Sequence, residues 1–79
     1  MTLVAITGAT GLVGSNVCLQ LRDEGARVRA LVRDPAAAAP LADLGVELVA
    51  GDVTVRADVE RLVAGADRVV HSAAISVVW

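Results

Sequence analysis

The chain has 79 residues, enough for one small domain, and 56% of them are hydrophobic, as expected of a parallel sheet covered on both faces. Its net charge of −2 and its lack of Lys argue against a nucleic-acid partner, because phosphate backbones are bound by clustered Lys and Arg. One cysteine permits no internal disulfide, which favours a reducing, cytoplasmic environment, and no apolar run approaches the roughly 20 residues of a membrane span.

The first predicted elements are a strand and a helix joined by a glycine-rich turn. Apolar residues 3–7 predict the strand, and the run TGATGLVG extends from position 7 to position 14. A helix that starts after such a turn leaves backbone N–H groups unpaired, and its dipole favours an anion, so a phosphate site is expected. Gly8 can adopt a φ that other residues resist, Gly11 leaves room for a pyrophosphate, and Gly14 lets the helix approach the sheet. A glycine pattern alone is weak evidence, and its position after the first strand supports the nucleotide interpretation.

The first helix is predicted from apolar residues at helical spacing. Gly14, Val17, Cys18 and Leu21 form one apolar face, and Gly25 is suited to a C-terminal cap. Cys18 is therefore expected to be a small core residue and not a redox group.

Residues 27–32 predict a second strand, which leads into an alanine-rich connection over residues 34–45. Asp34 is suited to an N-cap and Pro35 to the first helical position. Pro40 then interrupts the pattern, so a short or broken helix is expected that ends at Gly45. A flexible linker of low complexity is the alternative.

Residues 46–50 and 68–72 predict the third and fourth strands, and a helix between them is expected to start at Thr54 and stop at Gly65. Asp58 lies early in this helix, where a negative charge suits the dipole. The alternation of strands and helices predicts an α/β fold, a Rossmann-type parallel sheet of strand order 3-2-1-4 with flanking helices.

Four motifs in this order resemble the short-chain dehydrogenase/reductase superfamily. They are TGxxGxxG after the first strand, LVRD closing the second, GDV after the third and VHSAA at the end of the fourth. The chain is most similar to the extended branch, the NAD-dependent epimerase/dehydratase and dihydroflavonol-reductase type. The resemblance implies that residues 1–79 are an N-terminal NAD(P)-binding Rossmann segment, an incomplete domain of a longer protein.

The resemblance also assigns roles at the cofactor. Arg33 would face the adenosine ribose and meet the 2′-phosphate of NADP(H), with NAD as the alternative because Asp34 lies beside it. Asp52 would accept from the adenine amino group and Val53 would pack near the ring. Asp52 could also be a turn residue bonded to its own backbone, and the two roles are not exclusive. The predicted cofactor-binding residues are Gly8, Thr10, Gly11, Leu12, Val13, Gly14, Arg33, Asp52, Val53, Ser72, Ala73 and Ala74.

No catalytic or metal-binding residue is assigned. His71 is the only His and could titrate near neutrality, but at the end of a strand expected to be buried a structural role is favoured. In the superfamily a Tyr, and a Lys four residues later, perform acid/base catalysis, and this chain contains neither residue.

The favoured hypothesis is the dinucleotide-binding part of an NAD(P)-dependent oxidoreductase or epimerase, which binds the adenine and pyrophosphate of NADP(H). A longer protein would add a small-molecule substrate, and members of the family often form homo-oligomers. The alternative is a non-catalytic, NADP-binding regulator or sensor of the atypical branch of the superfamily. A flavin or methyl-donor site is disfavoured, because such sites usually have the tighter GxGxxG spacing.

Overall fold

The computed structural model describes residues 2–9 and 12–71. Its elements, in chain order, are β1 (Leu3–Thr7), α1 (Leu12–Asp23), β2 (Arg27–Val32), α2 (Ala39–Asp43), β3 (Glu47–Ala50), α3 (Arg56–Val63) and β4 (Arg68–His71). The strands pair in parallel in the order β3-β2-β1-β4. The Rossmann-type sheet and its strand order, both predicted from the sequence, are confirmed.

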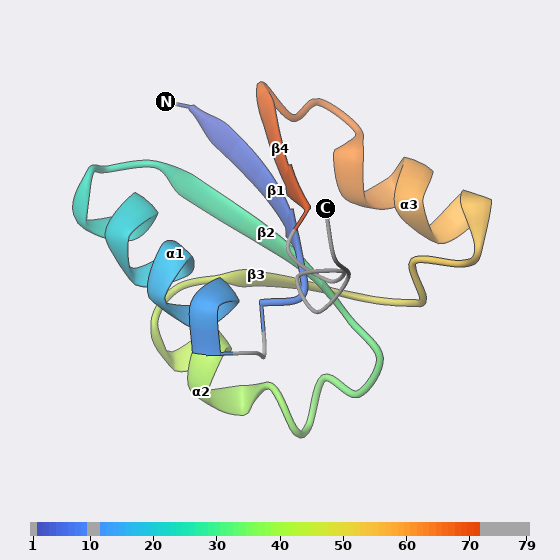
Figure 1. Ribbon diagram of the computed structural model, residues 1–79, viewed down its shortest axis with the longest axis horizontal. Coiled ribbons are helices and arrows are strands. Elements are labelled where there is room, and N and C mark those ends of the chain that lie inside the picture. The colour runs from blue at the N-terminus through green and yellow to red at the C-terminus, as the bar shows by residue number, and fades with distance from the viewer. Residues whose placement is uncertain (1, 10–11, 72–79) are drawn as a thin grey trace.

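Helices cover both faces of the sheet, with α1 and α2 on one side and α3 on the other (Figure 1). Successive residues of β1 point to opposite faces, as in any strand. Ile6 therefore packs in the cluster formed with β2, α1 and α2, whereas Ala5 packs against Leu31 of β2 and Leu62 of α3. Ala5 and Ile6 are both completely buried, so β1 is the centre of the core.

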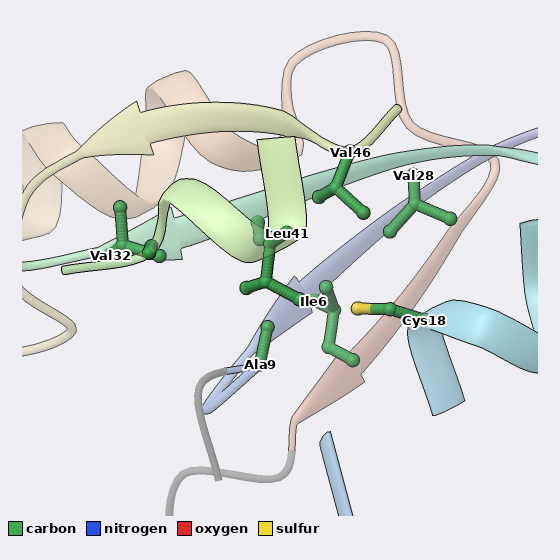
Figure 2. Close-up of a cluster of buried hydrophobic side chains, with 9 residues drawn as sticks. Ile6, Ala9, Cys18, Val28, Val32, Leu41 and Val46 are labelled. Carbon is green, nitrogen blue, oxygen red and sulfur yellow. The ribbon is translucent and has the colours of Figure 1, made fainter. Parts of the chain in front are cut away.

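The core on the α1 side includes the only cysteine of the chain. Figure 2 shows the Cys18 sulfur directed toward Ile6, and burial raises the pKa of the Cys18 thiol. The thiol is therefore protonated at neutral pH and packs as a small apolar group. Val17 and Leu21 pack against the same cluster, which confirms the predicted apolar face of α1.

Helix α1 ends at Asp23, and Gly25 forms the predicted C-terminal cap. The N–H of Gly25 donates to the carbonyl oxygen of Arg22 at 2.9 Å, and the N–H of Ala26 donates to that of Leu21 at 3.0 Å. These two bonds form a Schellman motif, which satisfies carbonyl groups left over at the helix end.

The prediction for the second connection was wrong in its first half. Residues 35–38 form turns, and α2 begins at Ala39, with Pro40 in its first turn. Oδ1 of Asp34 accepts the N–H of Ala36 at 3.1 Å, so this side chain closes a turn and caps no helix. A continuous helix would set the ring of Pro40 against the carbonyl group four residues earlier, so the helix begins beside the proline.

Two other predicted boundaries were displaced by one or two residues. β3 begins at Glu47 and not at position 46, and α3 begins at Arg56 and not at Thr54. The N–H and the hydroxyl group of Thr54 donate to Oδ1 of Asp52 at 2.9 and 2.8 Å, so Thr54 belongs to a turn before the helix.

The expectation of a buried fourth strand was also wrong. Val69 in β4 is 55% exposed, and His71 at the end of the described strand is exposed. In the described structure β4 pairs with β1 alone, and α3 packs on the other three strands. Ser72, the predicted last residue of this strand, lies outside the described residues.

Helix α3 is joined to the sheet at its C-terminal end. Nη1 of Arg29, on β2, donates to the carbonyl oxygens of Ala64 at 2.7 Å and Leu62 at 3.2 Å. The Arg29 side chain is only 15% exposed and also pairs with Glu47 of β3. This arrangement sets the position of α3 relative to β2 and β3.

Candidate functional site

A cleft of about 420 Å³ opens at the edge of the sheet where β1, β2 and β3 end. In the register of the sheet, Thr7 of β1 lies beside Leu31 of β2. Val32, the next residue of β2, lies beside Ala50 of β3, so the three strands end at nearly the same level. Ligands of open α/β folds bind at this carboxyl edge. The lining residues are Gly8, Leu31, Val32, Arg33, Asp34, Ala37, Gly51 and Val53.

The turn between β1 and α1 depends on two glycines. Gly8 has a φ of +70°, in the left-handed region where a side chain is strained. A Cβ added to Gly14 would overlap the carbonyl oxygen of Gly8 and lie 2.8 Å from the Cα of Ala9. The predicted close approach at Gly14 is present, and the group that it approaches is the turn itself.

The N-terminus of α1 lies beside this turn. Leu12 and Val13 are its first two residues, and its first turn contains no acidic side chain. The positive end of the helix dipole is therefore not neutralised by a neighbouring carboxylate on the helix, as an anion site requires. Thr10 and Gly11 lie outside the described residues, as do Ser72, Ala73 and Ala74.

Arg33 and Asp52 meet at the ends of β2 and β3. Nε of Arg33 lies 3.5 Å from Oδ2 of Asp52, and the Arg33 side chain is 79% exposed. The guanidinium group therefore remains accessible from the cleft. The structure thus brings together two residues that are 19 positions apart in the sequence and that were both predicted to bind the cofactor.

The carboxylate of Asp52 also forms the turn that follows β3. Oδ1 accepts the N–H of Thr54 at 2.9 Å and its hydroxyl group at 2.8 Å. Both donors lower the pKa of Asp52, the backbone N–H most, and Arg33 acts in the same direction. The alternative role considered for Asp52, a turn residue bonded to its own backbone, is therefore present. Val53 is 37% exposed at the cleft wall.

Asp58 is a residue whose position the sequence analysis did not anticipate. Its Oδ2 accepts the N–H of Asp52 at 3.0 Å, and its Oδ1 accepts from Arg61 at 2.5 Å. These bonds lower the pKa of Asp58, with the backbone N–H of Asp52 as the largest cause. Gly51 in front of Asp52 was a usable signal, because a glycine at that position leaves space for an approaching side chain.

His71 contacts the end of β1. Its Nδ1 and Oγ1 of the buried Thr7 lie 2.7 Å apart and share a hydrogen bond. The bond joins the ends of two paired strands, which agrees with the structural role favoured for this histidine.

Neither a metal site nor a membrane-spanning helix is found within residues 2–9 and 12–71. These residues contain no group of three or more His, Cys, Asp or Glu side chains placed to hold a metal ion. Over the same ranges, no helix is long and apolar enough to cross a membrane.

Comparison with known proteins identifies the family to which these features correspond. The family described as NAD dependent epimerase/dehydratase matches residues 4–78. The ceramide reductase of Caulobacter vibrioides is 40% identical over 73 residues, which cover 92% of this chain and 23% of that protein. The 3-beta-hydroxysteroid dehydrogenase of Mycolicibacterium neoaurum is 41% identical over 73 residues, which cover 91% of this chain and 19% of that protein.

A solved structure shows the same similarity in three dimensions. The NADPH-dependent quinone oxidoreductase of Escherichia coli, solved in complex with NADPH, superimposes with a TM-score of 0.72 and 30% sequence identity. The match covers 86% of this chain and 25% of that protein. The chain therefore spans a quarter or less of the length of these three proteins.

Proposed function

Because the chain belongs to the NAD dependent epimerase/dehydratase family, we propose that its cleft binds the adenosine and pyrophosphate parts of NADP(H) in preference to NAD(H). Membership of the family makes the chain an NAD(P)-binding, oxidoreductase-like unit, as the motifs predicted. The main observation behind the preference for NADP(H) is the exposed guanidinium group of Arg33 at the carboxyl end of β2.

The pyrophosphate would lie at the turn between β1 and α1. The left-handed φ of Gly8 and the tight packing of Gly14 against that turn bring the backbone close to the start of α1. Unpaired N–H groups at a helix N-terminus, with the positive end of the dipole, bind an anion without a basic side chain. This geometry supports pyrophosphate binding in a chain that has no Lys.

The 2′-phosphate would be bound by Arg33. A guanidinium group presents two parallel donors to a phosphate, and its pairing with the partly exposed Asp52 is weak enough to be exchanged for a ligand. Asp34 would be the carboxylate expected for the ribose hydroxyls of NAD. Its Oδ1 already accepts the N–H of Ala36, which supports the assignment to NADP(H). The NADPH complex of the quinone oxidoreductase from Escherichia coli supports the same choice.

The adenine would lie against Val53, with Asp52 at its edge. Val53 is exposed in the cleft wall, so a ring placed there would bury apolar surface. Oδ2 of Asp52 is not used by Thr54 and would accept from the adenine amino group. In a longer protein, this unit would supply the cofactor site of an oxidoreductase or epimerase/dehydratase that acts on a small molecule.

Isothermal titration calorimetry of the chain with NADP and with NAD tests the proposal. We expect NADP to bind at least about tenfold more tightly, because a hydrogen bond to a charged group contributes roughly 1.5–3 kcal/mol. Equal affinities would contradict the preference for NADP. If neither dinucleotide binds, the assignment of the cleft is wrong.

A further inference from the structure

The turn that contains Asp52 is held by a hydrogen bond to the side chain of Asp58, which lies outside the cleft. Asp58 lies on α3, on the sheet face opposite α1 and α2, and it is not among the lining residues. Its side chain is 19% exposed, and its Oδ2 accepts the N–H of Asp52 at 3.0 Å. One carboxylate oxygen of Asp58 thus determines where the backbone of Asp52 lies.

Gly51 has no side chain, and this leaves the space that the side chain of Asp58 occupies. A Cβ added at Gly51 would lie 2.7 Å from both the Cβ and the Cγ of Asp58. Atoms at that separation overlap, and the Cβ of Asp58 cannot move without moving α3. The backbone of Gly51 and the side chain of Asp58 are therefore in direct contact, and Gly51 itself lines the cleft.

A second side chain of α3 completes the arrangement. Nη2 of Arg61 donates to Oδ1 of Asp58 at 2.5 Å and to the carbonyl oxygen of Ala50 at 3.1 Å. The N–H of Gly51 donates to the carbonyl oxygen of Val32 at 2.9 Å. Three consecutive residues, 50–52, thus each have a backbone group bonded to α3 or β2.

We propose that Asp58 is a positioning residue for the adenosine end of the dinucleotide site, acting through the backbone of Gly51 and Asp52. Asp58 does not touch the cofactor. It sets the place of the Asp52 carboxylate and of Val53, the two groups between which the adenine would lie. The inference rests on the proposed function of the cleft. The competing interpretation is that Asp58 only stabilises the N-terminus of α3 through the helix dipole.

The first test is the affinity for adenosine 2′,5′-bisphosphate, measured by calorimetry in the 79-residue chain. Asp58→Ala leaves the Asp52 N–H without its acceptor, and we expect affinity to fall about tenfold. Asp58→Asn keeps an oxygen acceptor of the same size, so a loss of less than about threefold is expected. Glu60→Ala is the matched control, because Glu60 also forms an ion pair on α3, with Arg56, and is exposed. It should bind as the unmodified chain does.

The second test is independent of any ligand. The amide proton of Asp52 is expected downfield in ¹H–¹⁵N spectra, because its N–H donates to a carboxylate. It should move upfield in Asp58→Ala and remain in place in Glu60→Ala. A general loss of helix stability would not select this amide, so the signal separates positioning from stabilisation of α3.

The outcomes are distinguishable. If the unmodified chain binds neither adenosine 2′,5′-bisphosphate nor NADPH, the proposed function fails and this inference falls with it. If the unmodified chain binds and Asp58→Ala binds within twofold of it, the positioning role alone is overturned. Should Asp58→Ala not fold, Arg61→Leu replaces it, since this exposed residue contacts both Asp58 and Ala50. A loss of about threefold is then expected, and unchanged affinity overturns the inference.

Discussion

The guanidinium group of Arg33 lies 3.5 Å from the carboxylate of Asp52, measured from Nε to Oδ2, and this pair links the ends of β2 and β3. Both side chains are solvent-accessible, at 79% and 36% exposure, so water and salt weaken their attraction. The pair therefore keeps Arg33 near the cleft. A ligand phosphate that replaces Asp52 as the partner of Arg33 loses little energy by breaking the pair.

Arg33→Ala is expected to abolish the preference for NADP over NAD. Among the described residues that line the cleft, Arg33 is the only Arg, so NADP affinity should fall roughly tenfold to a hundredfold in the variant. NAD has no 2′-phosphate, and its affinity should change by less than about threefold. Calorimetric titration of both dinucleotides measures the two values. Arg56→Ala is the control, since Arg56 is 93% exposed and pairs with Glu60 on α3. A loss of NADP affinity in the control equal to that in Arg33→Ala would contradict the assignment.

Asp52→Asn is expected to increase the selectivity for NADP. The substitution keeps the oxygen that accepts from Thr54, and it puts an NH2 group, which cannot accept from the adenine amino group, in place of Oδ2. It also removes the negative charge that pairs with Arg33 and repels a phosphate. The ratio of NADP to NAD affinity should rise about twofold to fivefold, the range for an exposed ion pair. The adenine contact is common to both ligands, so the ratio isolates the 2′-phosphate. Asp43→Asn, which removes the same charge at the end of α2, should leave the ratio unchanged.

Gly14→Ala is expected to displace α1 from the β1–α1 turn. The new methyl group overlaps the carbonyl oxygen of Gly8, and relief of that overlap should cost about 1–3 kcal/mol of unfolding free energy. NADPH binding should be lost as the helix N-terminus moves. Gly25→Ala is the control, because an added Cβ meets no atom within 4 Å and only the φ of +85° is strained. Urea unfolding and NADPH titration separate the two variants. NADPH binding by Gly14→Ala at the level of Gly25→Ala would count against the pyrophosphate site.

Acidification is expected to destabilise the chain through Asp52 and Asp58. Hydrogen bonds hold the pKa of each carboxyl below its ordinary value of 3.8 in the folded state. A carboxylate with a lowered pKa stabilises the fold fully above its ordinary pKa, and this contribution disappears as the pH falls through the lowered value. Thermal unfolding midpoints should therefore decrease below about pH 4, and Asp58→Asn should show a shallower decrease. Glu60→Gln serves as the comparison. An equally steep decrease in Asp58→Asn would show that Asp58 does not contribute.

The regular elements could be predicted because their signals are local. Apolar runs marked the four strands to within one residue of their described bounds, and glycines marked the ends of α1 and α2. The turn after β2 could not be predicted from propensity. Alanines there favour a helix, whereas Pro40 and the bond from Ala36 to Asp34 favour a turn.

The contacts in the cleft could be predicted only in part, because they join residues that are far apart in the sequence. Order along the chain placed Gly8, Arg33 and Asp52 at one edge, because parallel strands all end on the same side. The contacts among these three residues depend on the path of the segment that follows each strand, before the chain returns to the sheet. The pairing of Arg33 with Asp52 is such a contact, and no sequence spacing encodes it.

By itself, the sequence determined the α/β class, the strand order and the presence of a glycine-rich turn before α1. Hydrophobic periodicity and glycine positions act over a few residues, and right-handed crossovers then leave few topologies. Only the tertiary structure decided that Asp58 would support Asp52 and that Arg29 would bind the C-terminal end of α3. Both outcomes depend on which groups of α3 and the sheet come into contact. The distances between these groups follow from the packing of α3 against β1, β2 and β3.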